Sequence, residues 1–128
     1  PGTWFHYDGD VARQVRQRQF PIVGNGNGAW SWLHVEDAAL ATLAAAERGH
    51  PGIYLIAADQ PRPVHEWLPA FAASVDAPPP PRDSVEAALE REGGADAAYY
   101  ATRMRGVSNA KARRELNFRP RPLEWIRQ

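Results

Sequence analysis

The chain contains no cysteine among its 128 residues, which excludes disulfide bonds and thiolate chemistry and fits a reducing compartment. It has no excess charge of either sign, with 15 basic and 15 acidic side chains, so its composition favours neither nucleic acid nor an acidic membrane as a partner. It also lacks a long apolar run and a secretory leader pattern, which predicts a soluble, cytoplasmic protein without a membrane segment. Because 44% of the residues are hydrophobic, we expect about one domain with a buried core.

The most informative stretch covers residues 24–39 and reads GNGNGAWSWLHVEDAA. Its first five residues alternate glycine with asparagine, which predicts a tight loop because both residue types tolerate positive φ angles. The aromatic and β-branched run at 30–35 predicts a strand of about six residues. A helix is expected to begin at Glu36 and Asp37, whose carboxylates suit the positive end of a helix dipole and can cap free N–H groups.

Alternation along this strand places three candidate side chains, Trp30, Trp32 and His34, on one face. The two tryptophans are interpreted either as core residues or as pocket walls, since an indole favours burial with its N–H satisfied. His34 is interpreted as a hydrogen-bonded structural histidine rather than a general base. No second histidine lies at metal-ligand spacing from it, so we expect no metal site.

Six further segments carry helical patterns, namely 11–18, 37–48, 64–72, 84–91, 95–105 and 108–116. The second of these is apolar almost all round, so neighbours are expected to cover most of it. The apolar run at 53–57 predicts a strand of the kind that is buried on both faces in parallel sheets. Too few other strands are predicted to complete such a sheet, and we expect its partners in an N-terminal portion or in a second copy of the chain.

Arginine and lysine crowd the segment 106–120. We interpret it as a solvated helix face, because the aromatic residues there are too few for a nucleic-acid stacking platform. Binding of nucleic acid is therefore not expected.

Taken in order, several segments resemble the C-terminal half of the extended short-chain dehydrogenases/reductases, the NAD-dependent epimerase/dehydratase family. The segments are Pro1-Gly2-Thr3, the glycine turn, WLHVEDAA at 32–39, GIYL at 52–55, and SNAKA with ELNFRP within 108–120. The resemblance implies an α/β fold, the incomplete C-terminal part of a Rossmann-type enzyme, with a late sheet strand and a small substrate-binding lobe. It covers nearly the whole of residues 1–128 as a single lobe, with the N-terminal dinucleotide-binding domain absent.

The resemblance also implies site residues. Pro1 and Gly2 would close the segment beside the nicotinamide of an NAD or NADP cofactor. Trp4 and Phe5 follow them and are candidates for lining a substrate cleft. Because the sequence has neither the family's GxxGxxG turn nor its Tyr-x-x-x-Lys pair, no cofactor binding and no catalytic residue is expected in this chain alone.

Family members that act on nucleotide sugars usually carry Arg-Asp-Phe where this sequence has Trp30-Ser31-Trp32. An indole cannot neutralise phosphate charge, which favours an apolar, aromatic or steroid-like carbonyl or alcohol over a nucleotide sugar. The first hypothesis is therefore the substrate-binding portion of an NAD(P)-dependent oxidoreductase or epimerase, inactive without its N-terminal half. The alternative is a stand-alone small-ligand or protein-interaction module whose copies complete one another's sheets.

Overall fold

Six helices form in the described part of the chain, which comprises residues 3–5 and 9–125 of this computed structural model. They are α1 (Asp10–Arg16), α2 (Val35–Arg48), α3 (Val64–Ser74), α4 (Val85–Leu89), α5 (Gly94–Thr102) and α6 (Ala110–Leu116). Each of them overlaps a helix predicted from the sequence. Ser84, the first residue of the pattern predicted over 84–91, caps α4, because its Oγ accepts a hydrogen bond from the Ala87 backbone N–H at 3.0 Å.

The strands are short and form three separate two-stranded pairs in the same described part. The bounds are β1 (Thr3–Phe5), β2 (Ile22–Val23), β3 (Ala29–Trp30), β4 (Trp32–His34), β5 (Arg62–Pro63) and β6 (Arg82–Asp83). The pairs β1–β4 and β2–β6 are parallel, and β3–β5 is antiparallel. The expected α/β class is confirmed.

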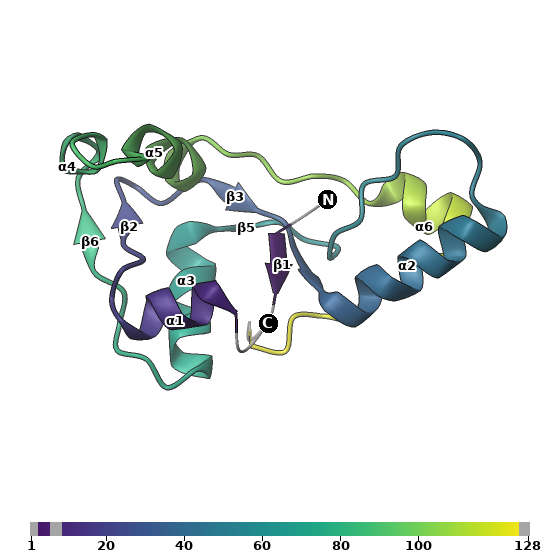
Figure 1. The fold of residues 1–128 in the computed structure, drawn as a ribbon, viewed down its shortest axis with the longest axis horizontal. Coiled ribbons are helices and arrows are strands. Elements are labelled where there is room, and N and C mark those ends of the chain that lie inside the picture. Colours follow the sequence, from purple (N-terminus) through teal and green to yellow (C-terminus); the bar gives the residue numbers. More distant parts are fainter. Residues whose placement is uncertain (1–2, 6–8, 126–128) are drawn as a thin grey trace.

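The elements are arranged in two parts that meet at the β1, β3, β4 and β5 strands (Figure 1). One part contains α1, α3, α4 and α5 together with the β2–β6 pair, and the other contains α2 and α6. The chain crosses between the two parts repeatedly, so segments far apart in the sequence lie side by side.

The strand predicted over 30–35 is shorter than expected and divided. Its two halves pair with different partners, because β3 lies against β5 while β4 lies against β1. Between them Ser31 is buried, and its Oγ accepts a hydrogen bond from the backbone N–H of Val107 at 2.8 Å. The change of partner at this residue therefore breaks the ladder into two.

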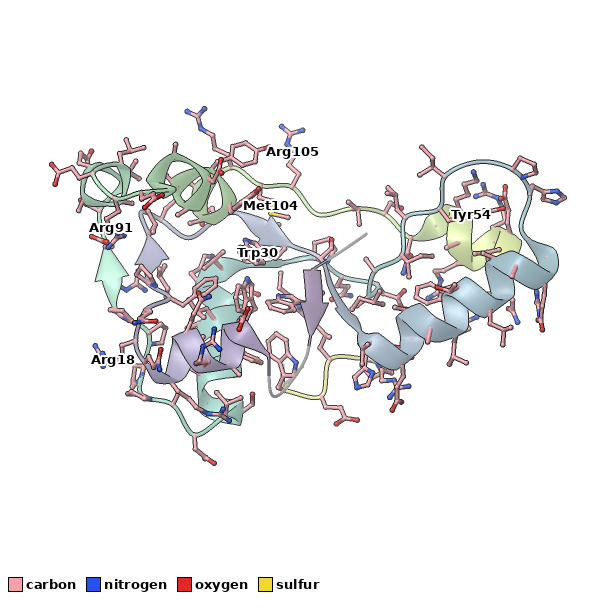
Figure 2. All side chains as sticks on the ribbon, in the orientation of Figure 1. Arg18, Trp30, Tyr54, Arg91, Met104 and Arg105 are labelled. Atoms are coloured by element: carbon pink, nitrogen blue, oxygen red, sulfur yellow. The ribbon has the colours of Figure 1, made fainter. Side chains whose placement is uncertain are left out.

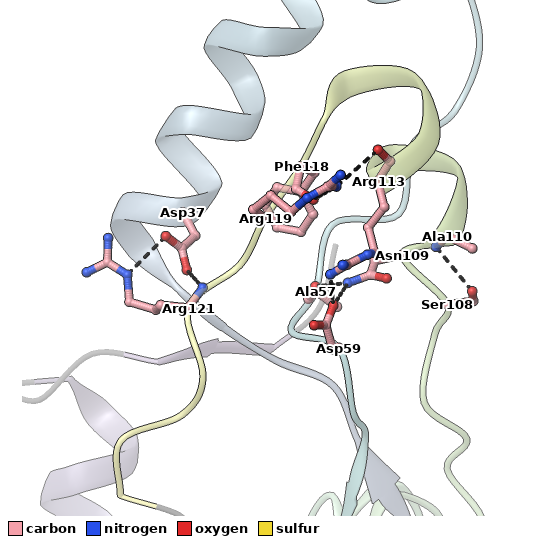
Figure 3. A network of polar contacts seen from close by, with 10 residues as sticks. All are labelled: Asp37, Ala57, Asp59, Ser108, Asn109, Ala110, Arg113, Phe118, Arg119 and Arg121. Atoms are coloured by element: carbon pink, nitrogen blue, oxygen red, sulfur yellow. Dashed lines mark hydrogen bonds and ion pairs between the residues drawn. The ribbon is translucent and has the colours of Figure 1, made fainter.

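The predicted capping role of Asp37 is wrong, because α2 begins two residues earlier and its N-cap is His34. The Nδ1 atom of His34 accepts a hydrogen bond from the Glu36 backbone N–H at 3.2 Å. Asp37 is instead buried, and it accepts hydrogen bonds from the backbone N–H and the Nε–H of Arg121 at 2.8 and 3.0 Å. These bonds attach the C-terminal segment to the start of α2 (Figure 3).

The predicted strand at 53–57 does not form in the described part of the chain. The side chains still alternate as they would in a strand: Tyr54 and Ile56 pack against the α2–α6 cluster, whereas Ile53 and Leu55 are 80% and 39% exposed. Among the described residues this segment has no strand beside it, and without one no ladder can form. The sequence places the partners of this strand in an N-terminal portion or in a second copy of the chain, so its burial on both faces stays a prediction.

The main core is an aromatic cluster between α1, α3 and the central strands. Trp32 and Trp67 are at its centre, with ring centroids 4.6 Å apart, and Phe71 and Trp125 pack around them. Edge-to-face arrangements predominate, as the quadrupoles of aromatic rings favour. A second cluster, built on Leu33 and the small residues of α2 and α6, joins the other part of the molecule.

A polar network fixes α6 to the segment that follows the extended run (Figure 3). Buried Asn109 donates from Nδ2 to the Ala57 carbonyl at 2.9 Å and to Asp59 Oδ1 at 2.8 Å. Arg113 Nη1 reaches the same carboxylate oxygen at 2.6 Å. The SNAKA motif therefore has a structural role here, which is to hold the 57–59 segment against α6.

Candidate functional site

The glycine loop positions the aromatic residues of the candidate site. Gly24 and Gly26 have positive φ angles of 59° and 64°, which confirms the tight turn. Gly28 then approaches α5 so closely that its N–H donates to the Ala101 carbonyl at 2.8 Å, and its own carbonyl accepts from the Val64 N–H at 3.0 Å. The loop therefore ties together β3, α3 and α5.

Trp30 follows this loop and is held from several sides. Its indole Nε1–H donates to the Tyr100 carbonyl at 2.9 Å. Its ring contacts Trp32 and Trp67 behind it, at centroid distances of 6.0 and 5.2 Å, and Phe20 and Tyr100 at 6.0 and 6.2 Å. A side chain that is hydrogen-bonded and packed in this way is fixed in one orientation.

A cavity of about 850 Å³ opens in front of Trp30. It lies between the C-terminal end of α1, the β2–β6 pair and α5, and it also reaches the first residue of α3. Its apolar wall comprises Phe20, Pro21, Val23, Trp30, Tyr100 and Ala101. In Figure 2, Trp30 lies toward the centre of the molecule, while Arg18 and Arg91 lie toward the outer edge.

The charged lining comes from three arginines and two aspartates, which are Arg18, Arg82, Arg91, Asp83 and Asp96. Arg91 Nη2 forms an ion pair with Asp83 Oδ2 at 2.5 Å, so these two charges neutralise each other. Within the described ranges, the side chains of Arg18 and Arg82 have neither a hydrogen bond nor an ion pair. The cavity thus combines an aromatic wall with unpaired positive charge.

Of the three residues predicted on the strand face, Trp30 and Trp32 are in ring contact, but the three have different surroundings. Trp30 lines the cavity, Trp32 lies behind it at 1% exposure and does not line it, and His34 caps α2 at the far end of β4. Trp4 and Phe5 belong to β1, where they pair in register with Leu33 and His34 of β4.

Pro1 and Gly2, predicted beside the nicotinamide, lie outside the described residues.

Sequence reasoning missed the arginines and two of the aromatic residues of the cavity. Phe20, Arg82 and Tyr100 come from three separate segments, which only the β2–β6 pairing and the close approach of α5 to β3 bring together. No local signal marks Tyr100 as a cavity residue, because exposed aromatic side chains are common on protein surfaces.

Other features offer less. A smaller cavity of about 180 Å³ lies near Asp59 and Arg121, where the hydrogen bond to Glu36 and the contact with Asp37 raise the pKa of Arg121 above its ordinary value. No group of three or more histidine, aspartate or glutamate residues suited to a metal ion occurs among residues 9–125 and 3–5. None of the helices described is long and apolar enough to cross a membrane.

Comparison with known proteins gives one family and several relatives. The family profile described as "NAD dependent epimerase/dehydratase family" matches residues 9–57. A Streptomyces sp. protein named 3-diazoavenalumate denitrifying reductase is 36% identical over 125 residues, an alignment that covers 98% of this chain and 41% of that protein. The chain therefore spans about two fifths of the length of this curated relative.

Solved structures show the same fold over part of their length. A conserved protein of unknown function from Silicibacter pomeroyi DSS superposes with a TM-score of 0.72 at 20% identity, covering 98% of this chain and 44% of that one. DesIV, a dTDP-glucose 4,6-dehydratase from Streptomyces venezuelae with NAD and TYD bound, gives 0.66 at 17% identity, with 96% and 38% covered. The α/β arrangement is thus the fold of a part of each of these structures.

Proposed function

We propose that this chain, which matches the NAD-dependent epimerase/dehydratase family profile over residues 9–57, is the substrate-binding lobe of an NAD(P)-dependent oxidoreductase or epimerase. Its substrate is a small carbonyl or alcohol. The cavity in front of Trp30 carries this proposal, because about 850 Å³ with an apolar wall and a few polar groups is typical of a small-molecule site.

The substrate is not a nucleotide sugar. The resemblance places the arginine and aspartate of nucleotide-sugar enzymes at the positions of Trp30 and Ser31, and here neither side chain is available to a diphosphate. The Trp30 N–H is engaged with the Tyr100 carbonyl, and Ser31 is buried against Val107. The curated relative, by its printed name, reduces 3-diazoavenalumate, which is not a nucleotide sugar.

The glycine loop of this chain does not fit a dinucleotide. It leads into β3 rather than into a helix, and the helix N-terminus beside it, that of α3, already donates to the loop carbonyls of Gly26 and Gly28. Its N–H groups are also engaged: Gly24 donates to Asp83, Gly26 to Val23 and Gly28 to Ala101. We therefore expect this chain not to bind the dinucleotide by itself, so hydride transfer requires a further domain that does.

Two uncovered apolar features support a Rossmann-type domain as the partner. Leu40 and Leu43 on α2 are 60% and 55% exposed, although the helix was expected to be covered. Ile53 and Leu55 project from an extended segment that has no strand neighbour within residues 3–5 and 9–125. A parallel sheet supplied by a second domain would cover both features, and the curated relative is long enough to contain one. A second copy of this chain is the alternative occupant.

Calorimetric titration tests the proposal. We expect 4-hydroxybenzaldehyde or 4-hydroxybenzyl alcohol to bind the chain, and UDP-glucose and NADH to give no heat. Trp30→Ala should abolish binding of the aldehyde. Tyr99→Ala, which removes an exposed ring outside the cavity lining, should leave it unchanged. Tight binding of NADH by these 128 residues would refute the proposal.

Sedimentation distinguishes between the two proposed partners that could cover the exposed apolar side chains of α2 and of the 53–55 segment. If a second copy covers them, the chain dimerises and Leu43→Glu returns it to a monomer. If a Rossmann-type domain covers them, the chain sediments as a monomer at micromolar concentration, and Leu43→Glu changes nothing.

A further inference from the structure

The cavity in front of Trp30 has two chemically different walls. One wall is aromatic and includes Trp30, whereas Arg18, whose side chain is unpaired among the described residues, lies toward the outer edge (Figure 2), and Arg82 also lines the cavity. A neutral ligand would use the first wall and leave the second to water. The chemistry of the lining residues therefore indicates which groups the ligand carries, in addition to the size that the cavity volume allows.

The aromatic wall favours a flat ligand. Phe20 and Tyr100 both stand edge-on to Trp30, at interplanar angles of 64° and 75°. An aromatic or conjugated ligand can continue this pattern by offering its face to one edge and its own edge to another ring. Since Trp30 is hydrogen-bonded and supported by Trp67, little side-chain entropy is lost when a ligand packs on it.

The charge at the outer edge suits one carboxylate. With Arg91 and Asp83 paired, the remaining charged lining consists of Arg18, Arg82 and Asp96, which is one net positive charge. A nucleoside diphosphate carries at least two negative charges and would exceed this. A monocarboxylate matches it, and guanidinium groups bind carboxylates with two parallel hydrogen bonds.

Arg18 is held in place by the end of α1. Its φ angle is 57°, and two hydrogen bonds close the helix around it, from the Arg18 N–H to Val15 at 3.1 Å and from the Gln19 N–H to Gln14 at 2.8 Å. Glycine is the residue that usually occupies this left-handed position. The backbone conformation of this turn therefore does not explain an arginine at position 18, and its side chain is available to a ligand in the cavity.

We infer that the cavity binds an aromatic or conjugated monocarboxylate, with its flat part against Trp30 between Phe20 and Tyr100 and its carboxylate on Arg18 and Arg82. This inference rests on the proposed function and names the substrate class of the same site. The reacting carbonyl or alcohol belongs to the same molecule, and the carboxylate orients it.

Tryptophan fluorescence titration with trans-cinnamate and its neutral isostere cinnamamide provides the test. We expect cinnamate to bind about tenfold more tightly, which corresponds to one charge-assisted pair. Arg18→Gly should reduce cinnamate binding about fivefold or more and leave cinnamamide binding unchanged. The glycine preserves the end of α1, so an unchanged melting temperature shows that the variant is folded. Arg105→Ala removes an exposed arginine outside the cavity lining and should change neither ligand.

The outcomes separate this inference from the proposed function. Equal binding of cinnamate and cinnamamide, or no effect of Arg18→Gly together with Arg82→Gln, overturns the carboxylate assignment while binding of 4-hydroxybenzaldehyde still supports a carbonyl site. Tighter binding of UDP than of cinnamate overturns the inference in favour of a nucleotide. If none of the aromatic probes binds, both the inference and the proposed function are refuted.

Discussion

Replacing Gly28 with alanine is expected to destabilise the chain and to disturb the cavity together. A Cβ atom at this position would lie 2.2 Å from the Tyr100 carbonyl oxygen and 2.8 Å from the Ala101 carbonyl carbon. The backbone cannot withdraw freely, because it is hydrogen-bonded to Ala101 on one side and to Val64 on the other. Either α5 moves away from β3 or one of these hydrogen bonds breaks.

The magnitude follows from these two effects. Overpacking of a close contact costs about 1–3 kcal/mol, and a lost backbone hydrogen bond adds about 1 kcal/mol, so the free energy of unfolding should fall by about 2–4 kcal/mol. Because the displaced Tyr100 carbonyl also holds the indole of Trp30, ligand binding should weaken in the same variant.

Gly93→Ala is the matched control, measured by urea denaturation beside Gly28→Ala. Gly93 has a φ angle of 72°, but no atom lies within 4 Å of a Cβ built on it, so the cost is conformational alone and amounts to about 1–2 kcal/mol. If Gly28→Ala is as stable as the original chain, or more stable than Gly93→Ala with equal m-values, the close approach of β3 to α5 is refuted.

Substitutions at three further positions test one left-handed backbone position and two attachments between segments. Asp76→Val places a β-branched residue at a φ angle of 54° and should lower the unfolding free energy by about 1–2 kcal/mol in thermal denaturation, whereas Asp76→Gly should not lower it by more than about 0.5 kcal/mol. Asp37→Ala leaves the Arg121 N–H without its acceptor, so we expect a loss of about 2–3 kcal/mol and faster hydrogen exchange at that amide; unchanged exchange would contradict the contact. Asn109→Ala removes the donor to the Ala57 carbonyl and should cost about 1–3 kcal/mol by urea denaturation, and a neutral result would show that the bond is not made.

The helices could be predicted from the sequence because their signals are local. Ser84 before α4 and Asn117 after α6, which takes the left-handed conformation at a φ angle of 53°, act within one turn of the residues they cap. The buried face of α3 could be predicted in the same way, because the spacing of Val64, Leu68 and Phe71 places them on one face of a helix and all three are buried.

The strands were less predictable because a strand depends on its neighbour. The run at 30–35 has strand composition throughout, yet its halves pair with β5 and β1, elements about 30 residues away on either side. The run at 53–57 has equally strong strand composition and stays unpaired among the described residues. Composition shows that a segment can be extended, but only the rest of the fold decides whether anything pairs with it.

The cavity was predicted in one residue, Trp30, and its charge was not predicted at all. Arg18 and Arg82 are 64 positions apart in the sequence, and nothing local connects them. They approach the same cavity because Pro21 leads from α1 into β2, and β2 pairs with β6, which places Ile22 opposite Arg82. Because the pairing of two distant strands brings these arginines to one cavity, their spacing in the sequence does not predict the site.

The resemblance places arginine and aspartate where this chain has Trp30 and Ser31, and the cationic side chains that line the cavity come from other positions. At position 30, a guanidinium would lie among Phe20 and Trp67, where its desolvation would be costly without a phosphate partner. Tryptophan satisfies its N–H on the Tyr100 carbonyl and makes this end of the cavity apolar. Within the described part of the chain, the unpaired cations of the lining are instead Arg18 and Arg82, so under the proposed function we expect a ligand to place an apolar ring against Trp30 and its charge on these arginines. In a site that binds a diphosphate through residue 30, the positive charge would lie at that residue. In this cavity residue 30 is an indole, and the positive charge comes from two arginines elsewhere in the lining.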